Sequence, residues 1–383
     1  MNFLIHGVDF NNKGAELMLY AVKQQADRWD LNNNCSLELK IGSFEQRNKA
    51  GIGHLLWRKS KIIPQLVPTL NLIGGLTPKS IRKNYNIVLE SEINAVLDAS
   101  GLAFSDQWGD GLTEAVAEKF FRWKKQGKKI ILLPQAFGPF TSNRIKQGFS
   151  KIVESADLIF ARDQISYEYV NQFSTALERV KIAPDFTNLV SGIEPSYIDR
   201  LVNKPCIVPN YRMIDKTSKE VSNNYISFLN LCIKYLLEKG LEPFILVHEV
   251  FDSKLAEELQ VNYKSKLPIV KETNPLFLKG IIGKCSFMIG SRFHGLVSSL
   301  SQAIPCIGTG WSHKYQMLFQ DYNCSDLLLN IEDDFSECLQ KIDLLIDDST
   351  RSQIINNIEL ASQKQKSLSK QMWFEIEKQL SSL

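Results

Sequence analysis

Short apolar runs alternate with helically spaced apolar positions along most of this chain. The run at 2–8 is followed by a polar turn at 9–13 and by apolar residues at helical spacing over 14–28, which predicts a strand followed by a helix. Further short apolar runs, each followed by a turn or a helical pattern, lie at 95–101, 128–135 and 156–163. Such runs are typical of parallel strands buried on both faces by helices.

The pattern restarts after a turn-rich stretch at 184–195. Strand-like runs follow at 204–211, 242–249, 267–272, 286–292 and 304–310. With 383 residues, 44% of them apolar, the chain is long enough for more than one core. We therefore expect an α/β protein with two Rossmann-like domains facing a cleft. The expected parts are an N-terminal domain at 1–195, a C-terminal domain at 203–348 and a helical segment at 349–383 packed back on the body.

The amino-acid composition limits the classes of protein to which this chain can belong. Lys and Arg number 45 and Asp and Glu 42, so the net charge of +3 argues against a surface built to bind nucleic acid. The seven cysteines are scattered without a CxxC pair, which indicates free thiols in a reducing compartment. No run of about 18 apolar residues occurs. These features predict a cytoplasmic protein.

One stretch, 51–89, is basic and contains no Asp or Glu. Apolar residues are interleaved with its lysines and arginines, a composition that can rest on an anionic membrane. The sequence thus allows peripheral contact with the inner face of a membrane. A substrate linked to a lipid would be within reach there. A solvated helical face or loop is the alternative.

The sharpest candidate site is the segment Gly290–Gly295, GSRFHG, between a strand and a helix. A helix N-terminus favours a phosphate or carboxylate, and Arg292 can bind either in a bidentate manner. His294 would donate or accept a proton beside that anion. The alternative is that Arg292 pairs with a carboxylate of the protein and that His294 is structural.

Three further positions follow strands of the same half. Lys314 can add a second positive charge, Arg212 follows the run at 204–211, and His248 ends the run at 242–249. For each of these residues taken alone, a role in the fold is the alternative to a role in ligand binding. Ligands bind beyond the carboxyl ends of strands in open α/β sheets, so their common placement favours an anion site.

The first half offers candidates for a hydroxyl-rich ligand. Asn11, Asn12 and Lys13 lie in the loop after the first strand, and Asp106 and Gln107 follow the run at 95–101. Neither loop has a GxGxxG or P-loop pattern, so a dinucleotide site is weakly supported. The five histidines show no HExxH or other paired ligand spacing, and we expect neither a metal nor a cofactor.

Taken together, these residues resemble the polysaccharide pyruvyl transferase family. The resemblance covers nearly the whole chain, through NNKGAELML, LLPQAFGPF, FARDQIS, APDFTN, VPNYR and IGSRFHGLVSSLSQAIPCIG. It implies a GT-B-like arrangement and transfer of a pyruvyl group from phosphoenolpyruvate to a sugar. It also implies that His294 is catalytic and that the donor-binding positions are Arg292, Arg212, Lys314, Gly295 and Arg162.

The chemistry of these residues suggests a mechanism. Cationic side chains would hold the donor phosphate and carboxylate while His294 protonates the methylene carbon. A pair of sugar hydroxyls, on a polysaccharide or its lipid-linked precursor, would then form a ketal. The alternatives are a GT-B glycosyltransferase using a nucleotide sugar, for which Glu249 could bind ribose, and a non-catalytic sugar-phosphate binding protein.

Overall fold

The computed structural model divides the chain into two compact units, and each is described by itself. It describes residues 1–30, 33–38, 40–56, 77–173, 177–263, 266–310, 312–330 and 335–381. Unit 1 consists of Met1–Phe10, Met18–Pro184 and Gln371–Leu383, and unit 2 of Asn11–Leu17 and Asp185–Lys370. The main division falls after Pro184, whereas the sequence placed the domain boundary between 195 and 203.

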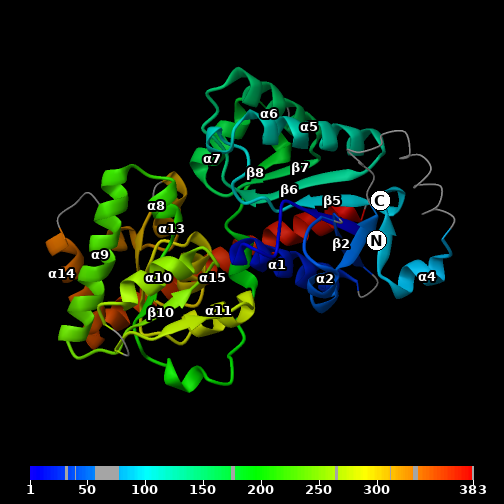
Figure 1. The fold of residues 1–383 in the computed structure, drawn as a ribbon. Helices are drawn as coiled ribbons and strands as arrows, with labels where there is room; N and C mark the ends of the chain where they lie inside the picture. Colours follow the sequence, from blue (N-terminus) through cyan, green and yellow to red (C-terminus); the bar gives the residue numbers. More distant parts are fainter. Residues whose placement is uncertain are drawn as a thin grey trace. The chain divides into compact units, whose positions relative to one another are not determined.

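Unit 1 is built on an eight-stranded parallel sheet with the order β4-β3-β2-β1-β5-β6-β7-β8. Its strands are β1 (Asn2–His6), β2 (Asn34–Glu38), β3 (Gly53–Leu56), β4 (Ile87–Leu89), β5 (Ala95–Asp98), β6 (Lys129–Gln135), β7 (Leu158–Ala161) and β8 (Val180–Ile182). The α-helices between them are α1 (Lys13–Trp29), α2 (Phe44–Lys49), α4 (Lys79–Asn84), α5 (Asp110–Lys125), α6 (Asn143–Ser155) and α7 (Gln164–Asn171). Helices α5 and α6 lie side by side (Figure 1).

Unit 2 carries a six-stranded parallel sheet with the order β11-β10-β9-β12-β13-β14. Its strands are β9 (Cys206–Val208), β10 (Phe244–Val247), β11 (Ile269–Lys271), β12 (Met288–Gly290), β13 (Cys306–Thr309) and β14 (Leu328–Leu329). The α-helices are α8 (Arg212–Asp215), α9 (Lys219–Glu238), α10 (Asp252–Gln260), α11 (Pro275–Ile282), α12 (Phe293–Leu300), α13 (His313–Asp321), α14 (Phe335–Ile346) and α15 (Asp348–Leu380). Two parallel sheets covered by helices confirm the predicted α/β fold class.

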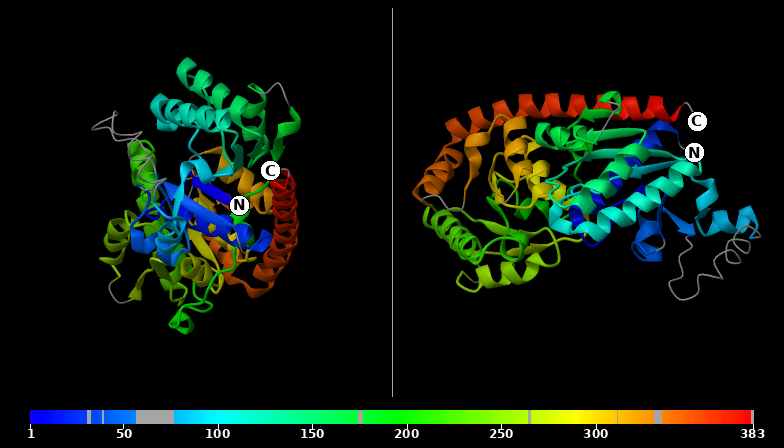
Figure 2. Two further views of the ribbon diagram at one scale, coloured as in Figure 1. Left: turned by 90° about the vertical axis from the view of Figure 1, so that its right-hand side faces the viewer. Right: turned by 90° about the horizontal axis from the view of Figure 1, so that it is seen from above.

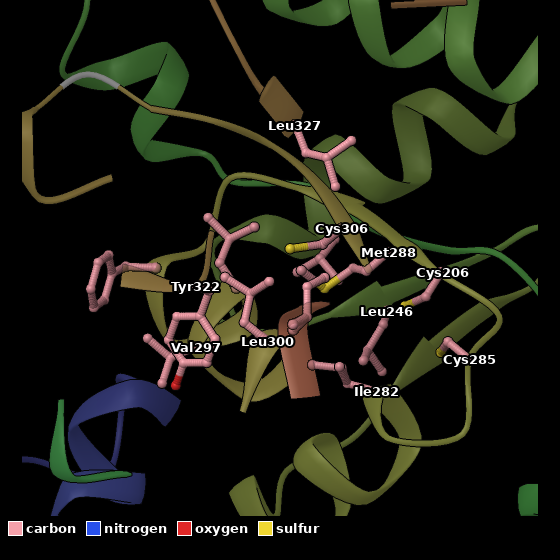
Figure 3. Packing of buried hydrophobic residues seen from close by; sticks show 14 of the residues in the cluster. Cys206, Leu246, Ile282, Cys285, Met288, Val297, Leu300, Cys306, Tyr322 and Leu327 are labelled. Atoms are coloured by element: carbon pink, nitrogen blue, oxygen red, sulfur yellow. The ribbon is translucent and has the colours of Figure 1, made fainter. Parts of the chain in front are cut away.

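The cores explain why the apolar runs become strands. Central strands such as β6 and β10 are buried along almost their whole length because helices cover both faces of the sheet. In unit 2, Figure 3 shows Cys206, Cys285 and Cys306 packed among Leu246 and Met288. These thiols act as small apolar groups in a close-packed interior.

The C-terminal segment is a single long helix. Figure 2 shows α15 running without a break, and its residues are divided between the two units at Lys370. In unit 2, Ser362 donates to the carbonyl of Ser301 at 2.9 Å. In unit 1, the indole of Trp373 packs against that of Trp29 with ring centres 5.7 Å apart. Each part of the helix is therefore a component of a different core.

Candidate active site in unit 2

The carboxyl ends of four neighbouring strands in unit 2 carry the charged residues that the sequence singled out. Arg212 follows β9, His248 follows β10, Arg292 follows β12 and Lys314 follows β13. The four strands are adjacent and parallel, in the order β10-β9-β12-β13. Their ends therefore meet at one edge of the sheet, where α/β proteins bind ligands.

Arg292 is the N-cap residue of α12, and its guanidinium is enclosed by two carboxylates. Nε donates to Oδ2 of Asp252 at 2.8 Å, Nη2 donates to Oδ1 of Asp252, and Nη1 donates to Glu249. Asp252 is fully buried and Glu249 nearly so. The carboxylate pairing that the sequence left open for Arg292 is thus present. These bonds use three of the five N–H donors of the guanidinium.

Asp252 also connects two loops at this edge. Its carboxylate accepts hydrogen bonds from the backbone N–H of Tyr211 at 2.9 Å and of Glu249 at 3.1 Å. Burial raises the pKa of Glu249, while the positive charge of Arg292 opposes that rise. The loops after β9 and β10 are therefore fixed around one buried guanidinium.

His294 occupies the second position of α12 and lies between two other segments. Its Nε2 is 3.6 Å from Oδ2 of Asp185, while a Cβ on Gly14 would lie 2.2 Å from Nδ1. The His294 side chain is 15% exposed. Gly14 therefore leaves the space that the imidazole fills.

Asp185 is held in place by Thr187. Oδ1 of Asp185 accepts hydrogen bonds from the backbone N–H of Thr187 at 3.0 Å and from its hydroxyl at 2.5 Å. Thr187 belongs to a 3-10 helix, η5 (Phe186–Leu189), and Asp185 is its N-cap residue. A buried carboxylate beside an imidazole orients the ring and stabilises its protonated form. The His294 and Asp185 pair is thus suited to general acid catalysis.

Lys314 extends the positive side of the site. Its Nζ lies 5.2 Å from the ring centre of Phe293, the residue before His294, and 5.2 Å from that of Tyr315. The Tyr315 hydroxyl donates to the carbonyl of Ser291 at 3.1 Å, which ties the start of α13 to the loop before α12. Lys314 and the two helix N-termini make this edge attractive to an anion.

His248 lies beside Gly295. A Cβ on Gly295 would be 3.7 Å from Cδ2 of the His248 ring. Burial and the positive charges of Arg292, His294 and Lys13 lower the pKa of His248 to about 3. The ring is therefore neutral near pH 7.

Arg212 is half-exposed at the start of α8. Its Nη1 donates to Asp215 at 2.7 Å, and its backbone N–H donates to Oδ1 of Asn210 at 3.0 Å. The amide of Asn210 in turn donates to the carbonyl of Ser291 at 2.7 Å. The loop that carries Arg212 is therefore anchored to the loop that carries Arg292.

The first loop of the chain also belongs to this unit. The sequence placed Asn11, Asn12 and Lys13 in the N-terminal domain, as candidates to bind the hydroxyl-rich sugar acceptor, whereas Asn11–Leu17 is part of unit 2. Oδ1 of Asn12 accepts from the backbone N–H of Gly14 at 2.9 Å, and Nζ of Lys13 donates to Glu16 at 2.6 Å. The first turn of α1 is thus capped and lies against His294 through Gly14.

A sequence model of the family described as polysaccharide pyruvyl transferase matches residues 12–313. The chain belongs to this family. The match includes His294, Asp185 and three of the four strand-end residues, Arg212, His248 and Arg292, and ends at His313, one residue before Lys314.

Solved structures show that the chain has the fold of GT-B-like enzymes. The chain resembles Anabaena HepE, solved in complex with UDP and glucose, at 13% identity and a TM-score of 0.62, covering 100% of this chain and 99% of that one. It also resembles MnaA of S. aureus, solved with UDP, at 11% identity and a TM-score of 0.58, covering 94% and 93%. The Neisseria meningitidis UDP-GlcNAc 2-epimerase matches at 10% identity and a TM-score of 0.56, covering 95% and 98%. At these low sequence identities, the similarity to the three enzymes is a similarity of fold alone.

Unit 1 has its own buried polar network at the carboxyl edge of its sheet. Asp98 accepts from Gln135 at 2.8 Å and from Ser100 at 2.7 Å, and one of its oxygens is 2.7 Å from Nδ1 of His6. These residues end β1, β5 and β6 or follow them directly. The network fixes the start of the loop that leads to the acceptor candidates.

The candidates in that loop have different surroundings. Asp106 accepts two hydrogen bonds from the backbone N–H of Thr141, at 3.0 and 2.9 Å, so its carboxylate joins two loops. Gln107 is exposed. Arg162, the remaining donor candidate, is buried after β7, and its backbone N–H donates to the carbonyl of Gln135 at 3.0 Å.

The basic stretch at 51–89 is only partly described, because 57–76 lie outside the described residues. Within the described part, Arg82 is buried and donates to Glu92 at 2.6 Å. None of the helices in the described ranges combines the length and apolar character needed to cross a membrane. Among those same ranges, no group of three His, Cys, Asp or Glu side chains could hold a metal ion.

Sequence reasoning missed two residues of the site, Asp185 and Asp252. Asp185 lies in the turn-rich stretch that the sequence placed at the end of the N-terminal domain, although its segment, APDFTN, was among the motifs that carried the family resemblance. Asp252 starts α10 and has no distinguishing neighbour in the sequence. Its role depends on a contact with Arg292, forty positions away.

Proposed function

We propose that this chain transfers the pyruvyl group of phosphoenolpyruvate to two hydroxyls of a sugar in a polysaccharide or its lipid-linked precursor, with release of phosphate. The observation that carries the proposal is the imidazole of His294 beside the buried carboxylate of Asp185, with the ammonium of Lys314 5.2 Å from the ring centre of the neighbouring Phe293. The proposal requires an acid and cations at one place, and these residues supply both.

Positively charged side chains would bind the anionic donor, phosphoenolpyruvate. Lys314 and Arg212, with the N-H groups at the starts of α12 and α13, would hold its phosphate and carboxylate. Arg292 would use the N–H donors that remain beyond its bonds to Asp252 and Glu249. The two carboxylates fix the plane of the guanidinium, which reduces the reorganisation needed when an anion arrives.

The reaction would begin with proton transfer from the His294 imidazolium to the methylene carbon of the donor. The electron pair of the double bond forms the new C–H bond, and positive charge develops at the carbon that bears the phosphate. A first sugar hydroxyl attacks that carbon, and its proton restores the imidazolium. The C–O bond to phosphate then breaks, a second hydroxyl adds at the same carbon to close the ketal, and its proton leaves with the phosphate. Asp185 stabilises the charged ring before and after the transfer.

The alternative of a nucleotide-sugar glycosyltransferase finds less support in the site. Glu249, the carboxylate that the sequence offered for ribose, accepts a hydrogen bond from Arg292 and is buried. A role in ribose binding would require that ion pair to open, which leaves a buried charge without its partner.

The test is isothermal titration with phosphoenolpyruvate and with a panel of UDP-sugars, followed by an assay of phosphate release in the presence of sugar acceptors. We expect saturable phosphoenolpyruvate binding and acceptor-dependent phosphate release. His294→Gln should abolish release and retain binding, whereas His54→Gln, at a buried histidine of unit 1, should keep both. Binding of UDP-sugars without any binding of phosphoenolpyruvate would overturn the proposal.

A further inference from the structure

A lysine buried in unit 2, Lys279, contacts the segment that carries Asp185, the carboxylate beside His294. Lys279, in α11, has 1% of its surface exposed. Its Nζ donates to the backbone carbonyl of Thr187 at 2.7 Å. A fully buried ammonium is costly unless it is bonded and near an opposite charge, and Asp185 provides that charge.

The segment that carries Asp185 is fastened to α11 at a second place. The backbone N–H of Ile193 donates to the carbonyl of Leu276 at 2.9 Å. Gly192 and Gly280 let the two backbones approach closely, since a Cβ on Gly280 would lie 2.0 Å from the carbonyl oxygen of Ile193. The segment is therefore held at its C-terminal end by backbone contacts and at its N-terminal end by Lys279.

A continuous set of contacts runs from this lysine to the reactive histidine. Lys279 bonds to the carbonyl of Thr187, the N–H and hydroxyl of Thr187 bond to Asp185, and Asp185 lies 3.6 Å from Nε2 of His294. We propose that Lys279 is a positioning residue that holds the Asp185 carboxylate against the imidazole of His294. The inference rests on the proposed function only in that His294 is the acid of that reaction.

The charges around Lys279 set how its role depends on pH. Burial lowers the pKa of Lys279 to about 7, Asp185 opposes that shift, and Lys366 on α15 adds to it. Two further titratable groups face Asp185: the His294 ring, whose Nε2 is 3.6 Å from it, and the hydroxyl of Tyr322 on unit 2, whose pKa is raised by burial and by the charge of Asp185. As the pH rises through 7, the ammonium becomes a neutral amine and loses its attraction to Asp185. The orientation of the dyad should therefore weaken above neutral pH.

Unit 1 offers a matched control. Lys128 is also a buried lysine whose pKa is lowered by burial, and its Nζ donates to the backbone carbonyls of Glu90 and Ile93 at 2.6 and 3.2 Å. Lys128→Met removes a buried ammonium from two carbonyls, as Lys279→Met removes one from Thr187. The two variants should therefore have similar losses of stability, and only the second should affect His294.

The first experiment titrates the histidine ring directly. With ¹³Cε1-labelled histidine the full chain gives five ring signals, and His294→Gln identifies the one from residue 294. We expect Lys279→Met to lower the titration midpoint of His294 by about one pH unit, because the imidazolium loses its carboxylate partner. Lys128→Met should leave that midpoint unchanged. An unchanged midpoint in folded Lys279→Met would overturn the inference, whatever the enzyme's substrate.

The second experiment is a double-mutant cycle on the rate of phosphate release. Lys279→Met should lower kcat about tenfold with little change in the KM for phosphoenolpyruvate, and should have no further effect in an Asp185→Asn background. Additive losses in the cycle would count against action through Asp185. If the ring titration shifts as expected but no phosphate is released by any form of the protein, the proposed function fails while the role of Lys279 stands.

Discussion

The first turn of α1 is shaped around His294 by Gly14, at which a Cβ would lie 2.2 Å from the ring nitrogen Nδ1. The contact brings the start of the chain to a residue nearly three hundred positions away. It gives a glycine near the N-terminus a role in placing the candidate acid.

Gly14→Ala should therefore reduce kcat by at least about tenfold, because the added methyl group must displace either the imidazole or the helix. Gly111→Ala is the matched control, since Gly111 is likewise the second residue of a helix, α5, and has nothing within 4 Å of a built Cβ. That control should keep activity and gain roughly 0.5–1 kcal/mol of stability from lower backbone entropy in the unfolded chain. Steady-state kinetics and urea unfolding measure both effects. Full activity in Gly14→Ala would show that the ring position is not critical.

Asp185→Asn should lower kcat by roughly 10- to 100-fold, since the neutral amide no longer stabilises the His294 imidazolium. The KM for phosphoenolpyruvate should change little. Asp347→Asn provides the comparison, because Asp347 accepts hydrogen bonds from the backbone and hydroxyl of Thr350, at 2.8 and 2.7 Å, as Asp185 does from Thr187. Equal losses of activity in the two variants would show that loss of such a turn disturbs the protein generally, and would contradict a specific role for the charge of Asp185.

His248 should make the protein less stable in acid. Its pKa is about 3 in the folded chain, below the ordinary value of 6.5, so between these values the unfolded state binds a proton that the folded state does not. Stability is then lost as the pH falls below 6.5, by about 2 kcal/mol between pH 6.5 and pH 5 at about 1.4 kcal/mol per unit. Urea unfolding of wild type and His248→Gln across this range should show a shallower loss in the variant. Parallel pH profiles would contradict the assignment.

The seven cysteines should be unreactive in the folded protein. All seven are buried and free, and burial raises the pKa of Cys35 to about 12 and that of Cys206, Cys232 and Cys306 well above the ordinary value. The thiolate is the reactive form, so a thiol reagent such as dithiobis-nitrobenzoate should react with them only as the protein unfolds. We expect slow colour development in buffer and seven equivalents in urea. Rapid labelling without denaturant would show that one of these cores opens.

The strands that could be predicted are those buried on both faces. KKIILLPQ and EPFILVHE are continuous apolar runs, and they became β6 and β10. Strands such as β2, with the sequence NCSLE, and the two-residue β14 carry too short a signal to separate from a loop. The fold class followed from the strands with strong apolar runs, whereas β2, β3, β4 and β8 of unit 1 and β14 of unit 2 were not predicted.

The site could be predicted only as far as residues that follow strands. Arg292 and His294 were found because GSRFHG lies between a strand and a helix. Their partners Glu249, Asp252 and Asp185 come from other loops, and nothing local marks a carboxylate that will face a guanidinium or an imidazole after folding. Asn11–Leu17 was assigned to the N-terminal domain by its place in the sequence, but its contacts place it in unit 2.

The division of α15 has a consequence for how the chain folds during synthesis. The strand β1 of unit 1 leaves the ribosome before any strand of unit 2, yet unit 1 also includes Gln371–Leu383, and Trp373 packs against Trp29. Unit 1 therefore cannot complete its core while the chain is still being translated through unit 2. Until α15 emerges, the part of unit 1 that is already made must remain with some of its apolar surface exposed, and is a natural client for chaperones that bind nascent chains.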